Sequence, residues 1–310
     1  MRTDVTFDSV GITIAGHLYT PADKPTGPRA AVVVGHPASG VKEQAAGLYA
    51  RHLAEHGFVA LAFDAAYQGE SGGKPRGLED PAQRVEDLKA AVSFLSTRAE
   101  VDADRIGALG ICASGGYVIP ASATDHRIKA VATVSGVDVG RSYREGPDGT
   151  QDPAIIQGLL DMAAQARTSE ARGEGISYFP IFPATAEQAY ELGGQHGREG
   201  FDYYCTDRAQ HARSAKEFTW SSIDRMATFE AFRFINLIAP RPLMMIVGTE
   251  AITRHMTTDA CADAQEPKQL HWIDGASHVD LYDKAKYVEP AVEKLTEFFD
   301  AGLAPDKPAA

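Results

Sequence analysis

The sequence predicts an α/β fold, with a doubly wound, mostly parallel sheet and a mainly helical insertion. Short continuous apolar runs such as 30–34 are typical of parallel strands buried on both faces. Helical patterns alternate with these runs over most of the chain. From about residue 139 to 236 the alternation stops, and helix-like runs and an aromatic cluster replace it. We therefore predict a core of residues 1–138 and 237–303, a helical cap insertion at 139–236 and a flexible tail at 304–310.

Local patterns predict the elements in order. Alternating apolar and polar residues, broken by glycines, indicate antiparallel opening strands within 5–20. Apolar runs predict further core strands over 30–34, 58–63, 105–110, 128–134, 242–248 and 270–273. Helical spacing and helix-end signals predict core helices over 42–55, 81–99, the segment after Cys112, 257–264 and 289–301. In the insertion, helix-like runs cover 154–171, 185–192 and 215–235.

Composition narrows the class of protein. The 310 residues carry a formal net charge of -12, which argues against nucleic acid or an anionic membrane as partner, because both would repel the chain. Cys112, Cys205 and Cys261 are the only cysteines; they fit neither a disulfide framework nor a zinc site and imply a reducing compartment. No segment resembles a signal peptide or a membrane span. We expect a cytoplasmic protein without metal or cofactor, acting on a small molecule, and leave a homodimer open.

The segment 105–117 has the pattern of a nucleophile elbow. An apolar run ends at Gly110, and two consecutive glycines open the predicted helix. Cys112 is flanked at two-residue spacing by Gly110 and Ser114, the small residues that a strained strand-to-helix turn requires. The dipole of the following helix would favour a thiolate at Cys112. We predict that Cys112 is the nucleophile.

Two other interpretations of this segment compete. Centring the motif on Ser114 would put Cys112 and Gly116 at its flanks and leave Gly110 without a role. Alternatively, Cys112 is buried and inert, because free cysteine packs as a small hydrophobe. The elbow glycines together with a downstream histidine favour a reactive Cys112.

The run Gly-Ile-Cys-Ala-Ser-Gly-Gly at 110–116, with Gly-Ala-Ser-His at 275–278, resembles the α/β-hydrolase superfamily. Within it the chain most resembles the cysteine-nucleophile branch, which includes dienelactone-hydrolase-like and polyketide-transferase-like hydrolases. The resemblance spans about 5–299, apart from the middle segment, which occupies the place of a cap. It implies an oxyanion hole formed by the backbone N–H groups of Ala38 and Ala113. His36, in the same loop as Ala38, is expected to organise the loop rather than to act as a base.

The resemblance also implies a general base and an acid that orients it. His278, in a loop after the last strand, is the expected base, with His271 as the other candidate. The position usual for the acid holds Ala251, so we expect the acid at Glu250 or Asp138. A third possibility is that the Cys–His pair requires no acid.

A cysteine nucleophile restricts the substrate. A thiolate leaves an acyl intermediate far more readily than an alkoxide or amine anion, so the substrate should be an activated acyl compound such as a thioester, enol lactone or aryl ester. The aromatic residues of the insertion either line a pocket for a bulky apolar or aromatic acyl group or hold the insertion to the core.

Three functions remain open at this point. Hydrolysis of the acyl group is the main hypothesis, and acyl transfer to an alcohol or amine is the alternative. Because the usual acid is displaced, a non-catalytic ligand-binding protein on the same fold is the hypothesis from another class.

Overall fold

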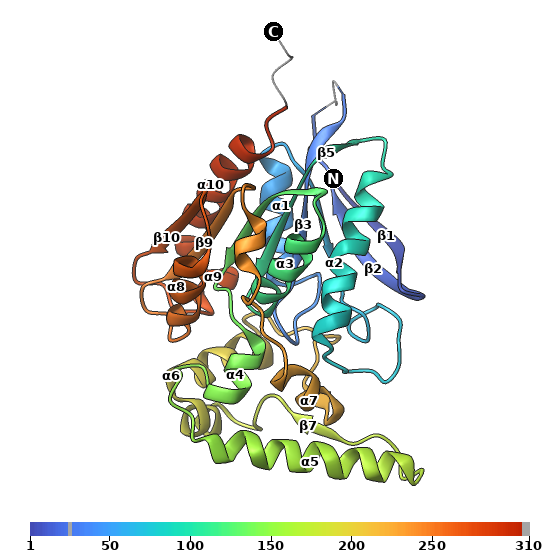
Figure 1. Cartoon of the computed structure of the whole chain (residues 1–310), viewed down its shortest axis with the longest axis vertical. Coiled ribbons are helices and arrows are strands. Elements are labelled where there is room, and N and C mark those ends of the chain that lie inside the picture. The colour runs from blue at the N-terminus through green and yellow to red at the C-terminus, as the bar shows by residue number, and fades with distance from the viewer. Residues whose placement is uncertain (24–26, 306–310) are drawn as a thin grey trace.

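The computed structural model describes residues 1–23 and 27–305. Its centre is an eight-stranded sheet in the order β1-β2-β4-β3-β5-β6-β9-β10 (Figure 1). β1 and β2 are antiparallel to each other, β2 is antiparallel to β4, and all remaining neighbours are parallel. The strands are β1 (Arg2–Ser9), β2 (Ile12–Tyr19), β3 (Arg29–Gly35), β4 (Val59–Phe63), β5 (Val101–Ile111), β6 (Ile128–Val134), β9 (Leu243–Gly248) and β10 (Lys268–Ile273). The predicted α/β fold with a mostly parallel sheet is confirmed.

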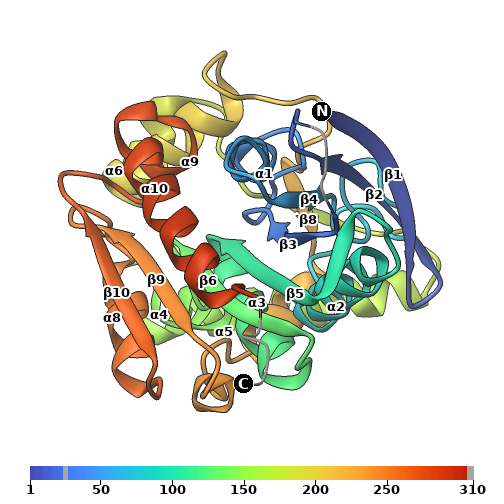
Figure 2. The same ribbon diagram turned by 90° about the horizontal axis from the view of Figure 1, so that it is seen from above.

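Helices cover both faces of this sheet because its central strands are apolar on both sides. Along β3, Ala31 and Val33 belong to one apolar cluster, whereas Val32 and Val34 belong to the other. The first cluster includes side chains of α2 (Pro81–Ser96), α3 (Ala113–Thr124) and α8 (Arg254–Asp263). The second includes side chains of α1 (Ala45–Glu55) and α10 (Ala285–Gly302), which lie on the opposite face (Figure 2).

The insertion lies beneath the sheet in Figure 1, at the end where the parallel strands finish. Its elements are α4 (Val139–Glu145), α5 (Pro153–Ala171), β7 (Tyr178–Pro180), α6 (Ala186–Cys205), β8 (Glu217–Thr219) and α7 (Ser221–Ala227). Two short elements complete the secondary structure of the described residues, η1 (Ile235–Ile238) and α9 (Asp280–Asp283). Residues 306–310, which hold most of the predicted tail, lie outside the described residues.

Two helical expectations within the insertion were wrong in extent. α6 runs well beyond residue 192, across a kink at Gly194 where φ is 58°. The expected helix over 215–235 is instead the strand β8, helix α7 and an irregular segment before η1. β8 pairs with β7, and Phe179 on β7 packs against Phe218 and Trp220. A three-residue strand is too short to show a period, so this hairpin depends on contacts between distant residues.

Polar contacts hold the insertion against the core next to α1. The backbone N–H of Ala45 donates to the Tyr203 hydroxyl at 3.0 Å, and the Gln44 side chain donates to the Ala209 carbonyl at 2.7 Å. Arg213 pairs with Glu43 at 2.5 Å. These contacts place α6 over the loops that follow β3 and β5.

The turn between β5 and α3 requires glycine at position 110. A Cβ atom added there would lie 2.1 Å from the Ser114 carbonyl oxygen, which is part of the backbone and cannot simply move away. By contrast, a Cβ atom added to Gly158 in α5 would meet nothing within 4 Å. The same glycine-to-alanine substitution thus meets backbone at position 110 and open space at position 158, so Gly158 serves as the control for Gly110.

We predict that Gly110→Ala lowers the free energy of unfolding by about 1–3 kcal/mol or more, because overpacking distorts the turn. Gly158→Ala should leave it unchanged or raise it by up to about 1 kcal/mol, because alanine favours a helix interior. Urea denaturation of both variants measures the difference. Equal stability of the two variants would contradict the close packing inferred for the elbow.

Candidate active site

Cys112 occupies the turn between β5 and α3 in a backbone conformation that is strained for a residue with a side chain. Its φ and ψ are 55° and -119°. The Cys112 carbonyl accepts hydrogen bonds from the N–H groups of Gly115, at 2.8 Å, and Val137, at 3.1 Å. The turn is thus held from both α3 and the segment after β6, and it has the geometry of a nucleophile elbow.

The two predicted oxyanion donors lie close enough to Cys112 to affect the pKa of its thiol. Burial raises the pKa of the Cys112 thiol, and hydrogen bonds from the Tyr282 hydroxyl and from the N–H groups of Ala113 and Ala38 act in the opposite direction. An acyl oxygen attached at this sulfur would lie within reach of the same two N–H groups. The structure therefore brings Cys112, Ala38 and Ala113 together.

The loop that carries Ala38 is fixed from below by His36 and Arg84. His36 is buried; its Nδ1 lies 2.6 Å from the Pro37 carbonyl, and its Nε2 accepts from the Ala65 N–H at 3.0 Å. Burial and the neighbouring Arg84 guanidinium hold the pKa of His36 well below its usual value. His36 is thus a neutral organiser of the loop, with both ring nitrogens engaged.

Ser114 also helps to hold the loop that carries Ala38. It is 2% exposed, and its hydroxyl donates to the His36 carbonyl at 2.6 Å and accepts from Arg84 at 3.3 Å. A hydroxyl held in this way faces the loop's underside. The competing assignment of Ser114 as nucleophile has no support in this arrangement.

His278 lies in the loop after β10, and both of its ring nitrogens contact neutral hydroxyl groups. Nδ1 is 2.7 Å from Thr253 Oγ1, and Nε2 is 2.9 Å from the Tyr282 hydroxyl. The side chain is buried, and burial together with the adjacent His196 holds the pKa of His278 well below its usual value. The imidazole is therefore neutral in the resting site and able to accept a proton.

Neither carboxylate expected to orient His278 contacts it. Glu250 is exposed, on the turn after β9. Asp138 accepts hydrogen bonds from the N–H groups of Arg141, at 3.0 Å, and Ala231, at 2.9 Å, so it caps α4 and anchors the end of the insertion. Among the hydrogen bonds of residues 1–23 and 27–305, Thr253 takes the place at Nδ1 that an acid would occupy. The other base candidate, His271, lies within β10 and pairs with Ile246 on β9.

The insertion contributes aromatic side chains and one histidine to the site. The Tyr204 hydroxyl donates to the Ala38 carbonyl at 3.2 Å, and Phe182 stacks on Tyr204 with ring centroids 5.0 Å apart. The His196 ring meets the His278 ring edge to face at 5.2 Å, and its buried Nδ1 has no hydrogen-bond partner among the described residues. Tyr203 packs against both Tyr204 and Tyr282. The aromatic residues therefore hold the insertion to the core next to the Ala38 loop and Tyr282.

Sequence reasoning missed Thr253, Tyr282 and His196. Thr253 lies shortly after the glycine that ends β9, near the position searched for an acid, but threonine is a common residue with no motif of its own. Tyr282 follows His278 at helical spacing, a signal that is visible only once the loop is known to turn into α9.

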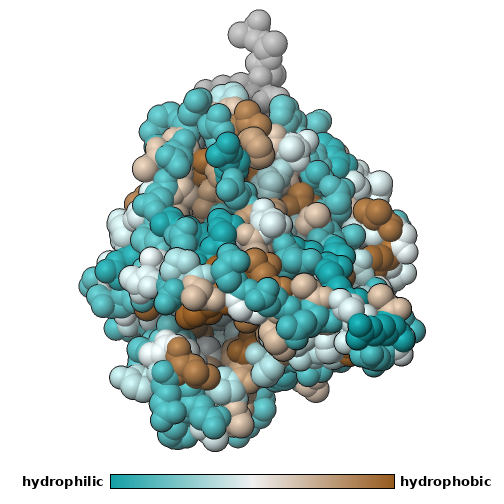
Figure 3. Space-filling view, turned by 60° about the horizontal axis from the view of Figure 1, so that its bottom comes forward, coloured by the Kyte–Doolittle hydropathy of each residue, from teal (hydrophilic) through white to brown (hydrophobic). Residues whose placement is uncertain are grey.

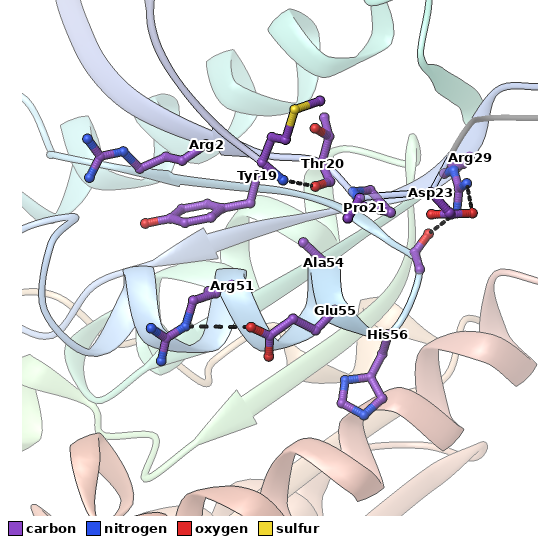
Figure 4. Close-up of a pocket in the computed structure, with 13 residues that line it drawn as sticks. Arg2, Tyr19, Thr20, Pro21, Asp23, Arg29, Arg51, Ala54, Glu55 and His56 are labelled. Carbon is purple, nitrogen blue, oxygen red and sulfur yellow. Dashed lines mark hydrogen bonds and ion pairs between the residues drawn. The ribbon is translucent and has the colours of Figure 1, made fainter.

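A hollow lies elsewhere on the molecule, away from Cys112 and His278. It has a volume of about 840 Å³ and is lined by residues from β1, β2 and the end of α1 (Figure 4). Its arginines are largely neutralised, since Arg29 pairs with Asp23 at 2.6 Å and Arg51 with Glu55 at 3.9 Å. None of its lining residues belongs to the elbow or to the His278 loop. This hollow is therefore separate from the candidate site at Cys112.

Within the described residues, no group of three or more His, Cys, Asp and Glu side chains is placed to hold a metal ion. Nor does any helix of the described chain have the length and apolarity to cross a membrane.

The insertion exposes the apolar side chains of Ile155, Met162, Tyr190 and Leu192, and Figure 3 shows apolar residues dispersed among polar ones on this face.

The sheet, the elbow and the histidine loop define an enzyme of the α/β-hydrolase type. More narrowly, the chain belongs to the dienelactone hydrolase family, whose sequence profile matches residues 14–171. The crystal structure of the hypothetical protein PA2218 from Pseudomonas aeruginosa superposes with a TM-score of 0.90 at 37% identity, covering 98% of this chain and 94% of that one.

Two fungal relatives are more distant. The thiohydrolase apmlB of Arthrinium phaeospermum is 28% identical over 73% of this chain and 73% of its own length. The polyketide transferase grgF of a Penicillium species is 26% identical over 90% of each chain. The expected resemblance to dienelactone-hydrolase-like and polyketide-transferase-like proteins is confirmed.

The buried neutral state of His278 predicts a dependence of stability on pH. Because its pKa is lowered in the folded protein, the unfolded chain binds more protons below about pH 6.5, the usual histidine value, and stability falls as the pH decreases from there. His278→Asn removes the imidazole that takes up this extra proton in the unfolded chain. The decrease in unfolding free energy between pH 7 and pH 5 should therefore become shallower, by up to about 1.4 kcal/mol per pH unit.

Urea denaturation of the wild type and His278→Asn at a series of pH values tests this. His36 remains in both proteins, so its own contribution cancels in the comparison. Parallel pH profiles would contradict a buried, neutral His278.

Proposed function

We propose that this protein hydrolyses an activated acyl substrate through a thioester intermediate on Cys112. The observation that carries the proposal is the strained position of Cys112 at φ 55° between β5 and α3, with the N–H groups of Ala38 and Ala113 close enough to affect the pKa of its thiol. Two preorganised donors at a nucleophile serve to stabilise the oxyanion formed in acyl transfer. A protein that only bound a ligand would need neither these donors nor a strained cysteine.

The reaction would proceed in two halves. In the first, the Cys112 thiol gives its proton to His278, the sulfur attacks the acyl carbon, and the oxyanion is held by Ala38 and Ala113. Collapse expels the leaving group, which takes the proton from His278. In the second half, His278 accepts a proton from water, the hydroxide attacks the thioester, and Cys112 leaves and is reprotonated.

The leaving-group order limits the substrates. The tetrahedral intermediate expels whichever group is the weaker base, and a thiolate, whose thiol has a pKa of about 8.5, is a far weaker base than an alkoxide. Simple alkyl esters and amides would return to starting material. Thioesters, enol lactones and aryl esters would proceed, and the relative named a thiohydrolase supports the thioester among these.

The surroundings of the sulfur favour a bulky apolar or aromatic acyl group. Tyr204 and Tyr282 both lie close enough to Cys112 for its thiolate to raise their pKa values, although burial is the larger cause for each. Phe182 extends this aromatic wall on the side of the insertion. Such side chains bind apolar groups well, while the hydroxyl of Tyr204 remains committed to the Ala38 carbonyl.

We predict that brief mixing with an aryl ester or a thioester adds one acyl mass to the wild type and none to Cys112→Ala. The reason is that Cys112 is the cysteine that lies close to both oxyanion donors. Intact-protein mass spectrometry measures the adduct. Cys205→Ala is the matched control. Cys205 lies at the end of α6, and the variant that lacks it should still gain the acyl mass to the wild-type extent.

Acylation of Cys112→Ala to the wild-type extent would exclude Cys112 as the nucleophile. Turnover without any adduct, unaffected by Cys112→Ala, would instead point to water activated directly by His278. Absence of both adduct and turnover across all three substrate classes would favour a binding protein on this fold.

The second candidate function is transfer of the acyl group to an alcohol or amine. It is favoured by the relative named a polyketide transferase, which matches 90% of this chain. With transfer, adding a primary alcohol at millimolar concentration should divert most of the acyl group into ester at an unchanged rate of acylation. Chromatography of the products measures the ratio; formation of acid alone at every alcohol concentration would leave hydrolysis as the function.

A further inference from the structure

Tyr282 occupies the position through which Cys112 and His278 would otherwise meet. It belongs to α9, is 2% exposed, and places its hydroxyl 2.9 Å from His278 Nε2. Nε2 is the nitrogen left for the nucleophile, since Nδ1 contacts Thr253 at 2.7 Å. The ring nitrogen expected to face the thiol thus faces a tyrosine hydroxyl.

The same side chain also lies close enough to Cys112 for the two groups to affect each other's pKa. A hydrogen bond from Tyr282 stabilises the Cys112 thiolate, in opposition to burial. The hydroxyl group therefore lies between the thiol and the imidazole. A hydroxyl both donates and accepts, so it is able to take one proton while giving up another.

Thr253 decides the direction of this chain of hydrogen bonds. When the neutral imidazole carries its proton on Nδ1, it donates to Thr253 Oγ1, and Nε2 is then free to accept from Tyr282. The oxygen of Tyr282 is in turn free to accept the thiol proton of Cys112. All three groups are uncharged in this state, as a buried site without a carboxylate partner favours.

We propose that Tyr282 is a catalytic residue that relays the proton between Cys112 and His278. In the forward step the S–H bond breaks and its proton binds the Tyr282 oxygen, while the original hydroxyl proton moves to His278 Nε2. The products are a thiolate, a neutral tyrosine and an imidazolium, and the reverse relay returns the proton to the leaving group. The inference rests on the proposed function, because it takes Cys112 to be the nucleophile.

The electrostatic surroundings suit a relay rather than an ionised tyrosine. Burial, with further contributions from Cys112, Tyr204 and Tyr203, raises the pKa of Tyr282 well above its usual value. The other ionisable groups acting on Cys112 or His278 are Arg84 and His196. Tyr282 therefore stays protonated at neutral pH and carries the proton only in transit.

The test is a double-mutant cycle on the alkylation of Cys112 by iodoacetamide at pH 7, followed by mass spectrometry of the Cys112 peptide. Tyr282→Phe removes one oxygen atom and keeps the ring that packs on Tyr203 at 5.1 Å. We expect Tyr282→Phe and His278→Asn each to slow alkylation by roughly a hundredfold, the lower end for loss of general base assistance. The double variant should be no slower than either single variant, because both interrupt one relay.

Tyr49→Phe is the matched control for loosening of α9. The Tyr49 hydroxyl on α1 donates to the carbonyl of Leu281, next to Tyr282 on α9, at 2.8 Å, so this variant removes a buried hydroxyl that holds α9 without touching His278. It should alkylate at the wild-type rate. If Tyr49→Phe slows alkylation as much as Tyr282→Phe does, the hydroxyl of Tyr282 acts by packing and the relay is excluded.

A wild-type rate for Tyr282→Phe, or a double variant in which the two effects multiply, would also overturn the relay. Alkylation needs no acyl substrate, so this result is separate from the proposed function. Failure of every acyl compound to load Cys112 would leave a non-additive cycle intact. Conversely, an acyl adduct with an additive cycle would support the nucleophile and reject the relay.

Discussion

The left-handed backbone of Cys112 imposes the constraint on which the rest of the site depends. A side chain held at φ 55° between a strand and a helix needs small neighbours, and a Cβ atom on Gly110 would lie 2.1 Å from the Ser114 carbonyl oxygen. The same tight turn brings α3 against the segment after β6, where a Cβ atom on Gly115 would lie 2.6 Å from Gly136 Cα. The strain that exposes the sulfur to its oxyanion donors is thus balanced by close backbone packing on both sides.

Around this turn the site is assembled from neutral groups. A carboxylate at Nδ1 of a histidine stabilises the imidazolium, whereas the Thr253 hydroxyl stabilises it less, and burial disfavours it further. The Cys112 thiol is likewise disfavoured as a thiolate by burial. The resting Cys112–His278 pair therefore holds no separated charges, and in the proposed reaction the Ala38 and Ala113 N–H groups would meet a negative charge only after attack on the acyl group.

The sequence was most informative where a steric rule acts over a few residues. The glycine at position 110 and the cysteine after it indicated the elbow, and continuous apolar runs indicated the parallel strands, because both requirements are local. The acid was not predictable in this way. Thr253 and Tyr282 reach His278 only through the folding of two separate loops, and each is an ordinary residue outside any motif. The β7–β8 hairpin was missed for the same reason, since its stability comes from Phe179 meeting Phe218 across a long connection.

The insertion and the oxyanion loop are mechanically linked through Ala38. The carbonyl of Ala38 accepts from Tyr204 on α6, while its N–H lies close enough to Cys112 to affect the pKa of its thiol. The next residue, Ser39, is also tied to the insertion, because its carbonyl accepts from the N–H of Ala215 at 3.0 Å. A displacement of α6 would therefore reorient the loop that stabilises the oxyanion. Under the proposed function, an acyl group that contacts Tyr204 would therefore also act on the position of the Ala38 loop.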